Sequence, residues 1–419
     1  MVNVKTYKNG LRLCHEKNDK NVVAVNILFN VGSCNESEDE QGYSHFIEHL
    51  MFKSSEKYST LEIMDKLSYY GADFNAYTSR TVTRYIFKCL KENFEPCFEI
   101  YSNMLIHPKF EESEMDKERG VVIEEMKKCD DDPVEVLYRT VMQNYYTDNS
   151  YAHDELGTEE IISNVSREQL LKYKNEHYTA DNCVISVAGN IEFDEIDSIV
   201  EKYFVSEFET EGKPYKVNAD EIVPNISKKY DVVERDDNQV NVCVHIKSLT
   251  ALDEKKYISD IYTSILGNSQ NSRLYKIIRE ELGLVYTVYA FSDMVASTGG
   301  IFIILGTRPK NVKKAIFEIK RIITELAEFG VTEEELERVK NLKKSLIEFG
   351  SETNSDIAES NGSMLHLFEK CKTIEERKQK IDSVTKEDVN AFAKVIASED
   401  VFNIVAVGKG VDLNDLKQF

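Results

Sequence analysis

The chain repeats itself once at an offset of 219 residues, and this internal repeat limits its possible folds more than any other feature. Three separate matches share the offset: the Ser and Thr helix starts at Ser166 and Thr385, the strand-ending glycines Gly189 and Gly408, and the Phe-Glu-Ile tripeptides at 98–100 and 317–319. A repeat of this length is much longer than a solenoid unit. It therefore predicts two similar domains of roughly 200 residues each.

Strand-like and helix-like patterns alternate within each half. The predicted strands are 21–31, 83–90, 239–246 and 300–307, and the predicted long helices are 94–106, 112–128, 311–329 and 332–349. This order predicts an α+β fold of two similar domains, each a mostly antiparallel sheet with helices packed on one face. We place the domains at 1–210 and 225–419, joined by a polar linker within 206–230 that contains two prolines.

Charge and composition restrict the partners and the compartment. A formal charge of −22 argues against nucleic-acid binding, because phosphate contacts need clustered Lys and Arg, and it favours cationic partners. The sequence has no signal-peptide pattern and no run of 18 apolar residues, so we expect a soluble, cytoplasmic protein without a membrane partner. Its eight cysteines form no C-x-x-C pair and are interpreted as reduced thiols.

The segment SHFIEHLM at 44–51 places three polar groups on one side of an otherwise apolar helix. A helix turns about 100° per residue, so His45 and His49 lie about 40° apart, with Glu48 on the same side. Two histidines at positions i and i+4 supply two of the three protein ligands that a catalytic zinc requires.

The third ligand is expected from the acidic helix at 112–128. Glu118 and Glu125 are seven residues apart on this helix and so lie within about 20° of each other. The corresponding helices of the second half, at 257–268 and 332–347, have no histidine and an apolar residue where Glu125 would fall. Because the repeat folds without these residue types, the first half is predicted to have them for chemistry.

The two motifs together resemble a known family. HFIEHLMFK followed by ERGVVIEEM is similar to the inverted zinc motif of the pitrilysin-type metallopeptidases, or inverzincins. The resemblance covers essentially the whole chain, in the compact two-domain form of mitochondrial processing peptidase subunits and their bacterial homologues. It implies that His45, His49 and Glu125 bind one zinc ion per chain, that Glu48 is the general base, and that Glu118 is a supporting carboxylate.

Two more segments match the family. GADFNAYT at 71–78 resembles the edge strand that pairs with an extended substrate, and the resemblance assigns Asn75, Ala76 and Tyr77 to substrate binding. In the second half, Arg279 and Tyr286 resemble the family's Arg/Tyr element. Either segment alone would also fit an ordinary turn or amphipathic helix, and only the zinc motif favours the functional interpretation.

The resemblance implies a zinc endopeptidase acting on peptides or unfolded segments inside a closed chamber. Zinc lowers the pKa of a bound water toward about 7, and Glu48 would move the water's proton to the leaving amine, a role worth ~10²–10⁴ in rate. Tyr286 and Arg279 would stabilise the oxyanion. Two alternatives remain: a catalytically silent homologue acting as a partner or scaffold, and a metal-dependent hydrolase with a non-peptide substrate.

The assembly prediction follows from the number of domains. Larger relatives bring four such domains together, whereas this chain has two. The resemblance therefore implies a homodimer in which zinc from one chain faces the Arg/Tyr element of the other, and a symmetric dimer is the commonest closed oligomer. From the acidic composition we further expect cationic peptides to be preferred substrates.

Overall fold

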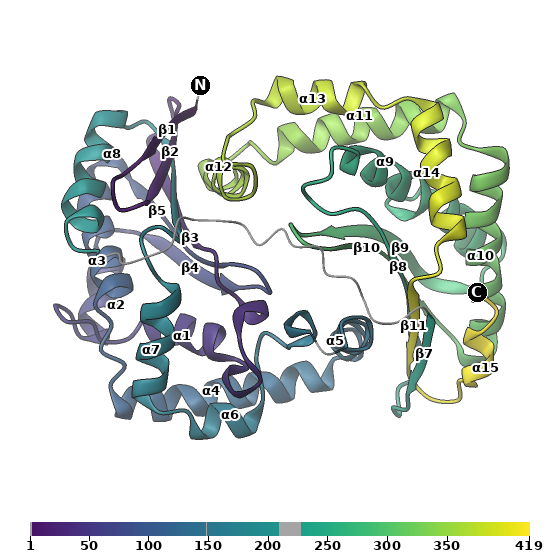
Figure 1. Cartoon of the computed structure of the whole chain (residues 1–419), viewed down its shortest axis with the longest axis horizontal. Coiled ribbons are helices and arrows are strands. Elements are labelled where there is room, and N and C mark those ends of the chain that lie inside the picture. Colours follow the sequence, from purple (N-terminus) through teal and green to yellow (C-terminus); the bar gives the residue numbers. More distant parts are fainter. Residues whose placement is uncertain (1, 148, 209–227) are drawn as a thin grey trace. The chain divides into compact units, whose positions relative to one another are not determined.

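The structure, a computed structural model, describes residues 2–147, 149–208 and 228–419, and Figure 1 labels its elements. Its residues group into two compact units. The first unit comprises Met1–Lys127, His153–Val217 and Glu348–Thr373, and the second comprises Lys128–Ala152, Asn218–Ile347 and Ile374–Phe419. Each unit is therefore built from segments of both halves of the sequence.

The first unit is organised around a six-stranded, mostly antiparallel sheet. Its strand order is β1 (Val2–Thr6), β2 (Arg12–Lys17), β6 (Cys183–Gly189), β3 (Val22–Phe29), β5 (Thr83–Leu90) and β4 (Asp73–Thr78). Only the β2–β6 pair is parallel. Strand β4 is the last strand of this order, so one of its two edges has no strand neighbour within the sheet.

Most helices of the first unit bury their apolar side chains against one face of this sheet. The core contains Val25, Ile27 and Phe29 of β3, which alternate along the strand as a pleated backbone requires. Its helical residues come from α1 (Tyr43–Met51), α2 (Thr60–Tyr69), α3 (Phe94–Ile106), α4 (Glu112–Asp131), α7 (Arg167–His177) and α8 (Phe193–Val200).

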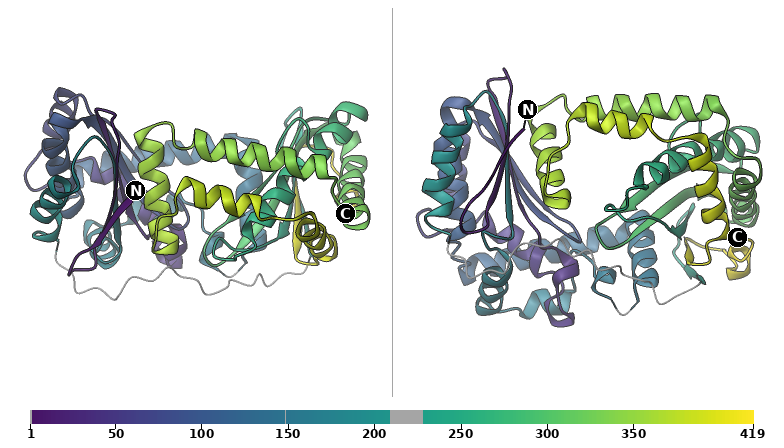
Figure 2. Two further views of the ribbon diagram at one scale, coloured as in Figure 1. Left: turned by 90° about the horizontal axis from the view of Figure 1, so that it is seen from above. Right: turned by 45° about the horizontal axis from the view of Figure 1, so that its top comes forward.

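The opposite face of the same sheet is covered by α12 (Asn354–Phe368), which comes from the second half of the sequence. Leu365 packs against Leu28 and Val184, and Ala358 packs against two further alanines. Gly362 permits this close approach, because an added Cβ would lie 3.1 Å from the Asn26 side chain. Figures 1 and 2 show α12 beside the sheet, on the side away from α3 and α8.

The second unit repeats the arrangement with a five-stranded sheet. Its strand order is β7 (Lys228–Val233), β11 (Phe402–Val407), β8 (Val240–Lys247), β10 (Gly299–Thr307) and β9 (Val285–Met294). Helices α9 (Lys256–Gly267), α10 (Val312–Phe329), α11 (Glu333–Phe349) and α14 (Lys386–Ser398) contribute to the core on one face. On the other face lies α5 (Pro133–Tyr145), from the first half of the sequence, where Asn403 donates a hydrogen bond to the Val141 carbonyl at 2.9 Å.

The helices α5 and α12 are equivalent members of the repeat. Their N-caps, Asp132 and Thr353, lie 353 − 132 = 221 residues apart, close to the offset of 219. Each half of the sequence thus contributes one helix to the unit built mainly from the other half. The unit boundaries at 127/128 and 347/348 fall inside α4 and α11, so a continuous helix carries the chain across each of them.

The prediction of an α+β fold with two similar domains is confirmed. The predicted packing of helices on one face describes most of the helices, but each sheet also has one helix on its other face. The boundaries predicted at 210 and 225, and most of the linker within 206–230, lie outside the described residues. Among the residues that the structure describes, no helix has both the length and the apolar character needed to cross a bilayer.

Candidate metal centre

The helix that carries the H-x-x-E-H motif begins at a buried carboxylate. Glu36 accepts the backbone N–H groups of Gly42 and Ser44, at 2.8 and 2.7 Å, so it satisfies two donors in the first turn of α1. Gly42 has φ +92°, a conformation that favours glycine. These contacts fix the start of α1, and with it the direction in which the following histidines project.

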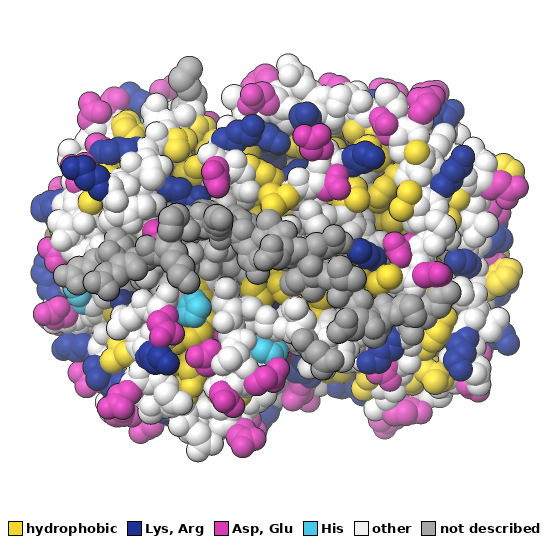
Figure 3. Space-filling view, in the orientation of Figure 1, with side chains coloured by type: hydrophobic (Ala, Val, Ile, Leu, Met, Phe, Trp, Pro, Cys, Tyr) yellow, Lys and Arg dark blue, Asp and Glu magenta, His cyan; other side chains and the backbone are white. Residues whose placement is uncertain are grey.

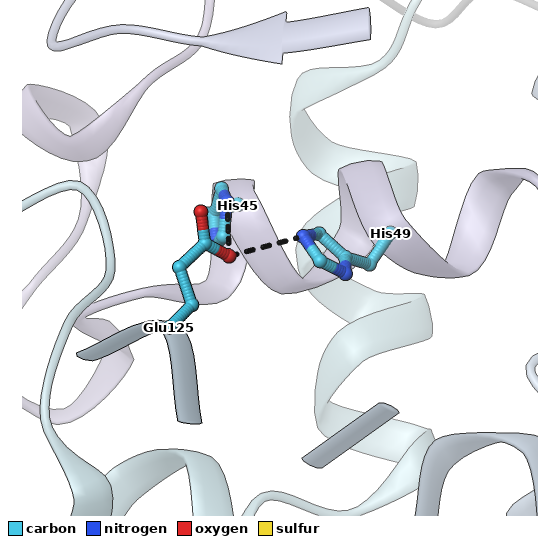
Figure 4. Close-up of side chains that lie close together, drawn as sticks. All are labelled: His45, His49 and Glu125. Atoms are coloured by element: carbon cyan, nitrogen blue, oxygen red, sulfur yellow. Dashed lines mark ion pairs between the residues drawn. The ribbon is translucent and has the colours of Figure 1, made fainter. Parts of the chain in front are cut away.

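Two helices bring the three predicted zinc ligands together. His45 and His49 project from α1, and Glu125 projects from α4, as Figure 4 shows. The Glu125 Oε2 atom lies 3.8 Å from His45 Nε2 and 3.6 Å from His49 Nε2. One ligand atom from each residue lies within 4.8 Å of the other two. The spacing predicted from the sequence therefore produces a single cluster of two imidazoles and one carboxylate.

The cluster fits the requirements of a zinc ion. Ligand atoms at about 2.0–2.1 Å from zinc with tetrahedral angles are separated by about 3.3–3.4 Å, slightly less than the two nitrogen–oxygen distances of 3.6 and 3.8 Å. Burial lowers the pKa of His45 to about 3, so its imidazole is neutral, as a ligand must be. Three protein ligands also leave a fourth coordination position, which is typical of catalytic zinc sites.

Glu118, to which the family resemblance assigns the role of a supporting carboxylate, contacts the ring of His49. Its Oε2 atom lies 3.2 Å from His49 Nδ1, which leaves Nε2 directed at Glu125. Burial alone would lower the pKa of His49, but the hydrogen bond to Glu118 and nearby carboxylates raise it. The other Glu118 oxygen lies 2.7 Å from Lys53 Nζ, and these two partners lower the pKa of Glu118.

Glu48, the predicted general base, lies between the ligand histidines in sequence and contacts the edge strand. Its Oε2 atom accepts a hydrogen bond of 2.6 Å from the Thr78 hydroxyl, at the end of β4. Burial raises the pKa of Glu48, and the Thr78 hydrogen bond opposes that change. A carboxylate with a raised pKa is a stronger proton acceptor than an exposed one.

The predicted substrate-binding residues Asn75, Ala76 and Tyr77 lie on β4, the edge strand just described. The Tyr77 hydroxyl donates to Glu359 of α12 at 2.6 Å, and Asn75 is exposed. A cavity of about 230 Å³ lies beside Asn75, and its lining includes both acidic and basic side chains, among them Asp73, Glu359 and Lys88. The role of Asn75, Ala76 and Tyr77 in substrate binding stays a prediction.

Arg279 and Tyr286 lie in the second unit, on the π-helical turn η6 (Tyr275–Glu281) and on β9. Arg279 donates a hydrogen bond to the Tyr275 hydroxyl, and the Tyr286 hydroxyl accepts one of 2.6 Å from Arg308. Both residues of the predicted element are partly exposed, so they are accessible within their own unit. Their role in catalysis also stays a prediction.

Four residues around the predicted site were among those not identified from the sequence. They are Glu36, which accepts backbone N–H groups at the start of α1; Lys53, which pairs with Glu118; Thr78, which donates to Glu48; and Arg308, which donates to Tyr286. Thr78 ends the segment that resembles the family's edge strand, so its position next to a functional stretch was the available signal. The other three have no spacing or motif that marks them.

Two family models and several named relatives match most of the chain. The family model described as insulinase (peptidase family M16) matches residues 12–159, and that of the peptidase M16 inactive domain matches 164–343. A zinc protease of Bacillus subtilis, YmxG, named uncharacterized, is 31% identical over 402 residues, covering 96% of this chain and 97% of the relative. One from Rickettsia felis, also named an uncharacterized zinc protease, is 28% identical over 423 residues, covering 100% and 99%.

Solved structures share the fold over nearly the full length. A protease from Helicobacter pylori has a TM-score of 0.88 at 22% identity, with 97% of this chain and 99% of that chain covered. The structure titled as a peptidase M16 inactive domain from Pseudomonas fluorescens has a TM-score of 0.89 at 19% identity, with 98% of each chain covered. Both proteins therefore share the two-unit architecture with this chain.

Proposed function

The chain belongs to peptidase family M16, and on that premise we propose that it is a zinc-dependent endopeptidase that hydrolyses peptides or unfolded polypeptide segments. The observation that carries the proposal is the joint presence, in one unit, of three suitable zinc ligands and a buried carboxylate between them in sequence. A silent homologue needs neither the ligands nor Glu48. The inactive-domain model matches mainly the second half, which lacks these residues, and so does not argue against the proposal.

The chemistry divides between the metal and Glu48. His45, His49 and Glu125 would hold the zinc, which would supply Lewis acidity and lower the pKa of a bound water toward about 7. Glu48 accepts the proton of the attacking water and later delivers it to the leaving amine, a role typically worth ~10²–10⁴ in rate. The Glu118 hydrogen bond keeps His49 Nε2 available for the metal.

The substrate is proposed to bind as an added strand. Among the described residues, one edge of β4 has no strand neighbour and can pair with an extended peptide, which favours a peptide over a compact non-peptide substrate. Cationic peptides are proposed to be preferred because the chain has 74 acidic against 52 basic residues. On the face shown in Figure 3 acidic and basic side chains are interspersed, so this face offers no large patch of a single charge.

We further propose that two copies of the chain pair, so that Arg279 and Tyr286 of one copy complete the site of the other inside a closed chamber. The support is chemical: a tetrahedral oxyanion needs hydrogen-bond donors, and an arginine and a tyrosine can supply them. The pairing is tested in solution by mixing two chains that are each inactive through a different substitution, as the Discussion describes.

The proposed function is tested by metal analysis combined with cleavage of an unstructured peptide. We expect about one zinc per chain and cleavage by the wild-type protein. His45→Ala and His49→Ala should lose both zinc and activity, whereas Glu48→Gln should keep zinc and lose activity. A zinc-loaded wild-type protein that cleaves no peptide would support the silent homologue, and activity of Glu48→Gln at the wild-type rate would exclude Glu48 as the base.

A further inference from the structure

The edge strand and the predicted general base are joined by one short hydrogen bond. Thr78 is the last residue of β4, and its Oγ1 atom donates to Glu48 Oε2 at 2.6 Å across a sequence separation of 30 residues. We propose that Thr78 is a positioning residue that holds the Glu48 carboxylate and couples it to the strand that receives the substrate. This inference rests on the proposed function, because it assigns a task to the base of that reaction.

Glu48 has few other groups to hold it. In the described part of the chain, the Thr78 hydroxyl is the one side-chain donor that hydrogen-bonds to the Glu48 carboxylate. The histidines on either side of it, His45 and His49, direct their Nε2 atoms at Glu125 instead. A glutamate has three rotatable bonds, so a single fixed partner determines which orientation its carboxylate keeps.

The backbone of Thr78 determines where a paired substrate would end. The amide of Thr78 also faces the Glu48 carboxylate and therefore points toward the free edge of β4. Backbone groups of an edge strand point outward at alternate residues. Ala76 and Phe74 therefore present their N–H and C=O groups at the same free edge.

Because outward-facing residues alternate along β4, the residue with which a substrate pairs determines which of its peptide groups lies next to Glu48. A substrate peptide that pairs with the backbone of Ala76 would next meet the position of Thr78, two residues further along β4. At Thr78 the Glu48 carboxylate occupies the place where the substrate backbone would otherwise pair. The substrate peptide group at that position then lies beside the base. Thr78 thus relates the pairing register of the substrate to the site where the proton is transferred.

The proposal requires a hydroxyl at position 78 and not merely a residue of threonine shape. Valine has nearly the same shape and suits a β-strand, but it cannot donate a hydrogen bond. Serine retains the hydroxyl without the methyl group. Thr60 provides a matched control, because its Oγ1 atom donates a hydrogen bond of 2.6 Å to Glu114 in the same unit, away from the ligands.

The test compares Thr78→Val, Thr78→Ser and Thr60→Val in peptide cleavage, with zinc content measured for each protein. Because hydrogen bonds to charged groups are among the stronger ones, we expect Thr78→Val to lower kcat by about 10- to 100-fold, with one zinc retained and KM changed less than kcat. Thr78→Ser should recover most of the lost kcat. Thr60→Val should leave kcat within about twofold of the wild type.

The outcomes separate this inference from the proposed function. If the wild type is active and Glu48→Gln is inactive, but Thr78→Val has wild-type kcat, the positioning role is wrong and the proposed function stands. If the zinc-loaded wild type is inactive, the proposed function itself fails. If Thr78→Val unfolds or loses zinc, Thr78→Ser is compared with Thr78→Ala at equal zinc content, and equal kcat values would overturn the positioning role.

Discussion

Replacing Glu118 with glutamine should weaken zinc binding without removing the site. Glu118 contacts no metal, but its Oε2 atom lies 3.2 Å from His49 Nδ1 and holds that ring with Nε2 toward Glu125. Carboxylates in this position typically contribute 10- to 100-fold to metal affinity. The Glu118→Gln side chain has nearly the same size, so the substitution changes mainly the charge and the strength of the hydrogen bond.

The structure places the expected effect at the lower end of that range. The hydrogen bond to His49 is long, and the Glu118 charge is shared with Lys53, whose Nζ atom lies 2.7 Å from the other carboxylate oxygen. We therefore expect the zinc Kd to rise about tenfold, which corresponds to about 1.4 kcal/mol. Glu118→Ala should cost more, because it leaves both His49 and Lys53 without their partner.

Competition with a chromophoric chelator measures the zinc Kd of each variant directly. Glu114→Gln is the matched control, since Glu114 is on the same helix and also partly buried, but it accepts hydrogen bonds from Ser54 and Thr60. We expect Glu114→Gln to lower thermal stability and leave the Kd unchanged. Wild-type zinc affinity in a correctly folded Glu118→Gln protein would refute the argument that Glu118 orients His49.

Three further predictions concern pH, assembly and charge. Burial raises the pKa of Glu36 to about 7, so its contribution to stability is fully present below its unfolded pKa and is lost as pH rises through 7. Between about pH 4 and 8, metal-free wild type should therefore lose about 3 kcal/mol of unfolding free energy relative to Glu36→Gln, and a constant difference in urea titrations would contradict this. For assembly, mixing inactive Glu48→Gln and Tyr286→Phe chains should restore activity through one intact site per mixed dimer, and no recovery after verified subunit exchange would mean that sites are not shared. For charge, a basic peptide should be cleaved faster than an acidic peptide of equal length at low salt, with the difference shrinking at high salt, and equal rates throughout would dismiss the preference.

The pairing of His45 with His49, and of Glu118 with Glu125, could be predicted because each pair depends on spacing within a single helix, whereas the choice of Glu125 as a ligand came from the family resemblance. His45 and His49 are one turn apart, and Glu118 and Glu125 are two turns apart, so helical geometry alone puts each pair on one face. The contacts of Glu36, Lys53 and Thr78 join separate elements, and neither helical nor strand periodicity in the sequence predicts them. Their partners became identifiable only when the packing of α1 against its neighbours was known.

The sequence did not predict that α5 and α12 each cover the sheet built mainly from the other half of the chain, and the reason is different. The repeat at 219 residues identifies equivalent segments, but it does not say which of two similar sheets each helix covers. The sheet faces that α5 and α12 cover contain buried residues of mixed polarity, such as Asn403 under α5 and Asn26 under α12. Local sequence therefore gave no preference, and the assignment depends on tertiary contacts.

The exchanged helix α12 also has a consequence for synthesis of the chain. The predicted zinc ligands and base have all been made at residue 125, and the last strand of the sheet, β6, is complete at residue 189, but α12, which covers the other face, comes only at residues 354–368. At roughly 5–20 residues per second, ribosomes need about 9–36 s for the 368 − 189 = 179 residues in between. During that time α12 does not yet cover the sheet surface that includes Leu28 and Val184. For the same reason, a fragment that ends at residue 208 lacks part of its own domain, and it should become soluble and fully folded only when co-expressed with residues 228–419.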